Sequence, residues 1–253
     1  MPKIEVTELL ARVGFRSPSE KLRAFVEHAI RGKLGPVETI EGMVAIERRE
    51  REDRNLVERT KRASLGSFPP LADFDWNHPR KIDRNLFEHL HDSLAFIERA
   101  ENVLLRGQSG VGKTMLAQNL GLAALSRGYS VRFSTLAAAM TDLLQKESLP
   151  ALERCLRNRY LSPSLLIIDE IGYLPCDSRS ADLLYNIVNR RHEKRSVVLT
   201  TNLAFKQWGT IFPGASSVAA LVDRFVQHCH VIDIDADSYR QKKSIRSLAK
   251  KPK

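Results

Sequence analysis

The chain has 253 residues, enough for one sizeable hydrophobic core and a small second domain. Hydrophobic residues make up 43% and charged residues 28%, as in ordinary globular proteins, and the net charge of +10 favours a polyanionic partner: nucleic acid first, with ribosomes and anionic membranes as alternatives. The three cysteines are scattered, which argues against a disulfide framework. No apolar run approaches ~20 residues and no signal-peptide core is present, so we expect a cytoplasmic protein without a membrane partner.

Residues 1–65 are predicted to form a small helical domain. In "KLRAFVEHAI", residues 21–30, apolar side chains recur at helical spacing, and residues 41–63 form a helix dense in both signs of charge. Its basic side chains are candidates for contacts with DNA: Arg48, Arg49, Arg51, Arg54, Arg59, Lys61 and Arg62. A solvated helix face with i,i+4 ion pairs explains the same charges.

Residues 66–78 carry Gly66, Pro69 and Pro70 and are predicted to be a linker. After it, short apolar strands alternate with helices. The strands are expected at residues 102–107, 129–134, 165–170, 196–202 and 230–234. This order predicts an α/β P-loop domain over residues 79–240, with a five-stranded parallel sheet and helices on both faces. Residues 241–253 form a basic tail, either a solubilising segment or a phosphate contact.

The stretch "RGQSGVGKTMLAQ", residues 106–118, matches the phosphate-binding pattern G-x-x-x-x-G-K-[ST] between a strand and a helix. Its backbone N–H groups are expected to cradle the phosphates of ATP at the helix N-terminus, with Lys113 reaching the β- and γ-phosphates and Thr114 binding Mg²⁺. The expected nucleotide-binding residues are Gly107, Gln108, Ser109, Gly110, Val111, Gly112, Lys113 and Thr114.

Two further strands end in polar residues. "LLIIDE" ends in Asp169, expected to hold Mg²⁺, and Glu170, expected to act as the general base on the attacking water. "SVVLTTN" ends in Asn202, whose amide is expected to fix that water and contact the γ-phosphate. Arg224 precedes the last strand and is either an arginine supplied to a neighbouring subunit or part of a surface ion pair, for instance with Asp223.

These motifs, in this order, resemble the IstB-like helper ATPases of insertion-sequence transposons, which are AAA+ proteins close to the helicase loader DnaC and the initiator DnaA. The resemblance covers about residues 48–242. It rests on "FPPLADFDW", "NVLLRGQSGVGKTMLA", "VRFSTLAAAMTDLL", "LLIIDEIGYLP", "VVLTTNLAFKQW" and "DRFVQHCHVIDIDADSYR". It implies that residues 107–114 are the Walker A loop, Asp169 and Glu170 Walker B, Asn202 the first sensor and Arg224 the arginine finger.

The resemblance also implies ATP-dependent oligomerisation on double-stranded DNA and recruitment or activation of a transposase. A helicase loader and a DNA-binding adaptor that does not hydrolyse ATP are the alternatives. One departure from the AAA+ pattern is that only about 19 residues follow Ile234, too few for a helical C-terminal lid, so Arg240 is the candidate for the second sensor arginine. Closure of the site is then expected to need a neighbouring subunit and the segment around Phe74 and Trp76.

Overall fold

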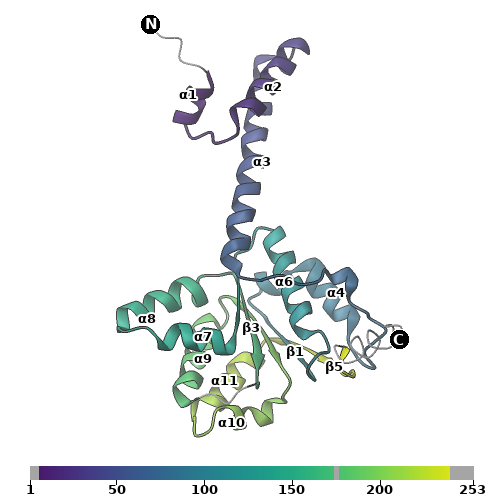
Figure 1. Ribbon diagram of the computed structural model, residues 1–253, viewed down its shortest axis with the longest axis vertical. Coiled ribbons are helices and arrows are strands. Elements are labelled where there is room, and N and C mark those ends of the chain that lie inside the picture. The colour runs from purple at the N-terminus through teal and green to yellow at the C-terminus, as the bar shows by residue number, and fades with distance from the viewer. Residues whose placement is uncertain (1–5, 174–176, 240–253) are drawn as a thin grey trace, which may run out of the picture. The chain divides into compact units, whose positions relative to one another are not determined.

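The computed structural model describes residues 6–173 and 177–239, and the chain divides into two compact units at the Arg59–Thr60 boundary. Among the described residues, the first unit contains α1 (Val6–Arg12), α2 (Ser19–Arg31) and most of α3 (Pro36–Ala63) (Figure 1). Leu22 and Ala29 of α2 are buried, whereas Ile30, expected on the same apolar face, is 72% exposed. Gly42 of α3 admits the ring of Phe25, because a Cβ at Gly42 would lie 2.0 Å from its Cζ.

A buried carboxylate, Glu47 on α3, holds the turn between α1 and α2. Its Oε2 accepts hydrogen bonds from the backbone N–H of Arg16 and of Ser17, both at 2.8 Å, and from Ser17 Oγ at 2.6 Å. Burial alone would raise the pKa of Glu47, but these hydrogen bonds, together with the charge of Arg54, lower it to about 2. The carboxylate is therefore charged at neutral pH and joins two segments of the unit.

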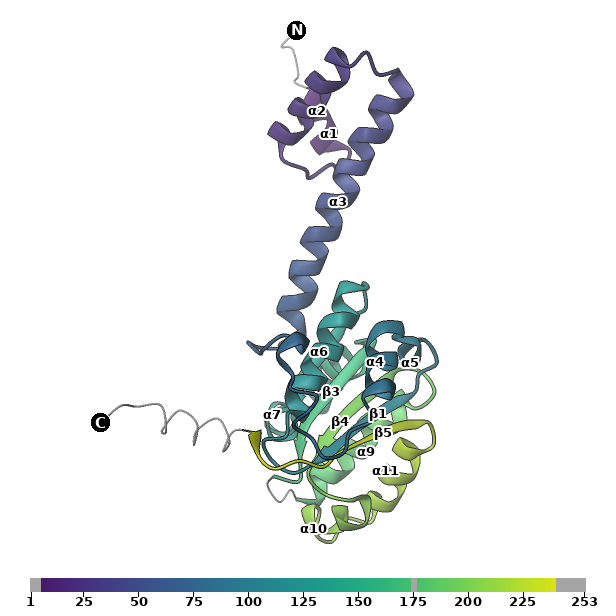
Figure 2. The same ribbon diagram turned by 90° about the vertical axis from the view of Figure 1, so that its right-hand side faces the viewer.

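The second unit is built on one parallel sheet (Figure 2), in the spatial order β2-β3-β4-β1-β5. Its strands are β1 (Asn102–Gly107), β2 (Val131–Thr135), β3 (Leu165–Ile171), β4 (Ser196–Thr201) and β5 (Cys229–Ile234). Its longer helices are α4 (Arg84–Ser93), α6 (Lys113–Ser126), α7 (Leu136–Leu144), α9 (Ser178–Arg191) and α11 (Ser217–Val226). The shorter elements are η1 (Leu71–Asp73), α5 (Ala95–Glu98), α8 (Leu149–Cys155), the π-helical turn η2 (Leu156–Leu161), η3 (Phe205–Gln207) and α10 (Trp208–Ile211).

Both faces of the sheet are covered. Side chains alternate along β3, so Ile167 approaches α6 at Gly121, while Leu166 and Ile168 belong to a core shared with α7, α9 and α11. The central strands are buried on both faces, which explains their continuous apolar sequence. The predicted α/β P-loop sheet and the helical N-terminal region are confirmed.

The segment predicted as a linker packs into the second unit. Phe74 within it is buried, and just before it Ala63 and Leu65 are buried, with Gln118 Nε2 of α6 donating to the Leu65 carbonyl at 2.7 Å. Asn119 Nδ2 likewise donates to the Pro69 carbonyl at 3.2 Å. The structure therefore divides the chain at Arg59–Thr60, ahead of the predicted position near residue 65, because the end of α3 already belongs to the second core.

The predicted lack of a lid, the sensor role of Arg240 and the basic tail 241–253 concern residues outside those described. Among the described residues, no helix combines the length and apolar character that crossing a membrane requires.

Candidate active site

The phosphate-loop sequence forms a tight turn between β1 and α6. Gly110 and Gly112 have φ values of +80° and +98°, in the left-handed region that favours glycine. A Cβ at Gly112 would also lie 2.7 Å from the ring of Phe74. Lys113 Nζ donates to the carbonyls of Gly107 and Gln108, each at 2.7 Å, so its ammonium group lies against the loop that the sequence assigns to phosphate.

A cavity of about 630 Å³ opens beside this turn. It is lined by residues 110–114 of the loop, by Asp169 and Glu170 of β3, and by Thr200 of β4. Several residues between 67 and 78 form another wall. The carboxyl ends of two central strands and the N-terminus of α6 therefore meet in one cavity, the usual place for a ligand in a parallel α/β sheet.

Two carboxylates lie beside the loop with different surroundings. Asp169 is 2% exposed, and its Oδ1 accepts a hydrogen bond from Thr114 Oγ1 at 3.2 Å. Glu170 is exposed and has φ +64°, a left-handed conformation that is rare outside glycine. A hydroxyl next to a carboxylate is an oxygen donor set of the kind that Mg²⁺ prefers, so Thr114 and Asp169 fit this ion.

Thr200 connects the two acidic residues, and the sequence interpretation missed it. Its hydroxyl donates to Asp169 Oδ1 and accepts the backbone N–H of Glu170 at 3.0 Å. The β3–β4 register shifts between Ile168 and Ile171, where these contacts form. The available signal was that Thr200 is a polar residue near the carboxyl end of the neighbouring strand.

Aromatic residues from three segments surround the loop. Tyr173 Oη donates to Ser109 Oγ at 2.6 Å, and Tyr239 N–H donates to the Gly110 carbonyl at 3.0 Å. The His78 and Tyr239 rings lie 5.0 Å apart. Tyr173, His78 and Tyr239 all line the cavity, and no local pattern predicts contacts between residues so far apart along the chain.

Two predicted catalytic residues lie away from the described cavity lining. The Asn202 side chain sits beside Gly172, where a Cβ would be 2.8 Å from its Oδ1. Arg224 is exposed on α11, and within residues 6–173 and 177–239 it forms no ion pair, so the alternative of a salt bridge with Asp223 is not what the structure has. The structure thus brings Lys113, Thr114 and the two carboxylates together, without Asn202 or Arg224.

The seven basic residues predicted to contact DNA fall into two groups. In the first unit, Arg48 pairs with Glu52, while Arg51 and Arg54 pair with Glu47. Lys61 and Arg62 belong to the second unit. The remaining two, on α3 of the first unit, are the exposed Arg49 and the partly buried Arg59.

Comparison with known families gives a match over nearly the whole chain. A family model described as "IstB-like ATP binding protein" matches residues 9–247. A putative ATP-binding protein of insertion sequence IS21 from Pseudomonas aeruginosa is 36% identical over 238 residues, 94% of this chain and 89% of that protein. The corresponding protein of IS232 from Bacillus thuringiensis subsp. berliner is 35% identical over 245 residues, 94% of each chain.

Solved structures of DnaA and DnaI share the fold. AMPPCP-bound DnaA from Aquifex aeolicus superposes with a TM-score of 0.57 at 22% identity, covering 74% of this chain and 57% of that one. DnaI superposes with a TM-score of 0.51 at 17% identity, covering 69% and 90%. At these identities the likeness concerns the fold alone.

Proposed function

The chain belongs to the IstB-like ATP-binding protein family, and from that premise we propose that it is an ATPase that assists transposition. It assembles on double-stranded DNA with ATP, hydrolyses the nucleotide, and recruits or activates a transposase at the target site. The observation that carries the ATPase proposal is the meeting of Lys113, Thr114, Asp169 and Glu170 at one cavity. The family's insertion-sequence relatives support the transposition role.

In this proposal each residue has one task. The loop N–H groups and Lys113 bind the phosphates, and Thr114 with Asp169 holds Mg²⁺, which would neutralise charge on the β- and γ-phosphates. Glu170 orients and deprotonates the attacking water. The Thr200 hydroxyl forms hydrogen bonds with both the backbone N–H of Glu170 and the carboxylate of Asp169, so it fixes the position of the base relative to the metal ligand.

The test measures phosphate release against protein concentration, with and without duplex DNA. We expect slow release by the chain alone and a marked increase with duplex DNA. Glu170→Gln should bind ATP but lose at least ~100-fold in rate, the usual contribution of a general base. Lys113→Ala should lose binding and release together. Lys206→Gln, a charge change outside the cavity, serves as the control.

Three outcomes contradict the proposal. Equal rates for wild type and Glu170→Gln would favour an adaptor that only binds ATP. A rate indifferent to DNA and to protein concentration would contradict assembly on DNA. Failure of the ATP-loaded chain to retain an insertion-sequence transposase on duplex DNA would contradict the recruitment role.

A further inference from the structure

A second cavity of about 630 Å³ lies in the second unit, where β2 and β3 begin, whereas the active-site cavity lies where β3 and β4 end. It is formed by the end of α3, by residues 130–132 where β2 begins, and by residues 158–163 leading into β3. Four cationic side chains line it: Lys61, Arg62, Arg132 and Arg159. Around them are Asn158 and the hydroxyls of Ser64, Ser130 and Ser162.

The described lining of this basic pocket contains no carboxylate and no aromatic side chain. Within the described residues, neither Lys61 nor Arg132 forms an ion pair, and the buried Nε of Arg132 has no hydrogen-bond partner. Arg159 is 53% exposed and shares the Asp142 carboxylate with Lys146. Because one carboxylate serves two cations there, that wall keeps a net positive charge.

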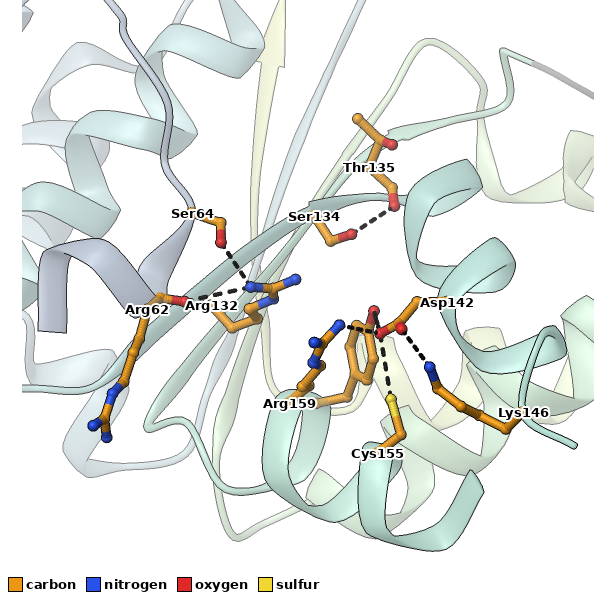
Figure 3. Close-up of polar contacts among 10 residues, drawn as sticks. Arg62, Ser64, Arg132, Ser134, Thr135, Asp142, Lys146, Cys155 and Arg159 are labelled. Atoms are coloured by element: carbon orange, nitrogen blue, oxygen red, sulfur yellow. Dashed lines mark hydrogen bonds and ion pairs between the residues drawn. The ribbon is translucent and has the colours of Figure 1, made fainter. Parts of the chain in front are cut away.

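The arginines are held in place before any ligand binds (Figure 3). Arg132 Nη1 donates to Ser64 Oγ at 2.7 Å and to the Arg62 carbonyl at 3.4 Å, which joins β2 to the end of α3. Asp142 accepts hydrogen bonds from Arg159, Lys146 and Cys155. Burial raises the pKa of Asp142, but these hydrogen bonds bring it well below its usual range, so the anchor stays charged.

The wall beyond Arg159 is also rigid. Arg191 is 1% exposed and its guanidinium donates to the carbonyls of Tyr160, Leu161 and Pro163. These three residues precede β3, so the clamp fixes the backbone that carries Ser162. A positive pocket with fixed guanidinium groups is preorganised for an anion, because little side-chain entropy remains to be lost.

We propose that this basic pocket binds a backbone phosphate of double-stranded DNA. The inference rests on the proposed function, which names DNA as the partner, and it places a contact on the second unit, apart from the arginines of the first. Guanidinium, ammonium, hydroxyl and amide donors are the groups that contact DNA phosphates. With no aromatic side chain in the described lining to stack on a base, the contact should be independent of sequence.

The test measures binding of a fluorescein-labelled duplex by fluorescence anisotropy at several salt concentrations. The variants are Lys61→Gln and Arg132→Gln, each of which removes one positive charge and keeps a polar side chain. Each lost phosphate contact should reduce the slope of log K against log salt by about 0.9 and weaken binding equally for unrelated sequences. Lys206→Gln, an equal loss of charge at the carboxyl end of the sheet, should keep the wild-type slope.

The outcomes separate this proposal from the broader one. Wild type that binds duplex DNA, with both variants retaining its affinity and slope, would overturn the pocket assignment alone. Wild type without affinity for duplex DNA would overturn both proposals. Lys61 is exposed at a helix end, so Lys61→Gln decides the question even where Arg132→Gln fails to fold.

A free nucleotide is the competing source of phosphate in this pocket. It would appear as ATP binding that survives in Lys113→Ala and disappears when Arg132→Gln is added. That result would also overturn the assignment to DNA.

Discussion

At the scale of single residues, Glu170 has a backbone conformation that is unusual for a residue other than glycine. A left-handed φ of +64° costs a residue with a side chain roughly 1–2 kcal/mol, and the residue in question is the proposed general base. The Thr200 hydroxyl, which accepts its N–H, helps to hold this conformation.

Replacing Glu170 should therefore separate stability from activity. Glu170→Gly relieves the left-handed strain and Glu170→Gln retains it, so we expect the glycine variant to be more stable than the glutamine variant by about 1 kcal/mol. Both should lack ATP hydrolysis. Thermal unfolding measures the stability of both variants. A glutamine variant at least as stable as the glycine variant would show that the Glu170 backbone is not strained.

Some residues of the candidate site could be predicted from the sequence, and others could not. Lys113, Thr114, Asp169 and Glu170 line one cavity, and their proximity could be predicted because each belongs to a local motif next to a strand. Thr200 was missed because its role depends on the shifted register between β3 and β4, which no local pattern encodes.

At the scale of elements, a buried charged carboxylate links two segments of the first unit. Glu47 on α3 accepts hydrogen bonds from backbone N–H groups of the α1–α2 turn, and its pKa is lowered to about 2. Because the folded pKa is below the unfolded value of 4.5, these hydrogen bonds contribute their full stability above about pH 4.5, and this contribution is lost as the pH falls toward 2.

Glu47→Gln should remove this pH dependence. The amide keeps one acceptor oxygen but loses the charge and the pairing with Arg54, so we expect a cost of about 1–3 kcal/mol at neutral pH. Hydrogen exchange at the Arg16 and Ser17 amides measures it locally. Glu52→Gln, an exposed change on the same helix, should alter little. Unchanged hydrogen exchange in Glu47→Gln would contradict the stabilising role of the Glu47 carboxylate.

Elements were predictable where periodicity is strong. All five strands and the long charged helix follow from apolar runs and helical spacing. The packing of residues 66–78 did not follow, because glycine and prolines indicate irregular backbone without revealing that Asn119 of α6 donates a hydrogen bond to the Pro69 carbonyl.

At the scale of the whole molecule, the predicted assembly rests on Arg224. This side chain is exposed and does not line the described cavity of its own chain. An arginine supplied by a neighbour stabilises charge on the transferred phosphoryl group and raises the rate by ~10³–10⁵. Such a role requires that its target be the cavity of another subunit.

Mixing two inactive variants tests this requirement. Arg224→Ala subunits retain Glu170, and Glu170→Gln subunits retain Arg224, so random mixing at equal ratio should restore roughly a quarter of the productive interfaces and part of the hydrolysis. Mixing Glu170→Gln with the double variant should stay inactive. The absence of recovery at every ratio would rule out action between subunits.

The basic pocket lies where β2 and β3 begin and the active-site cavity where β3 and β4 end, so the two proposed ligands would not compete for space. Any influence between them must then act as a coupling free energy, which is reciprocal. Whatever factor a bound duplex adds to ATP affinity, bound ATP must add to duplex affinity. In the proposed function, such a coupling would let the conversion of ATP to ADP change the rate at which the chain dissociates from DNA, so that hydrolysis would set the lifetime of the complex.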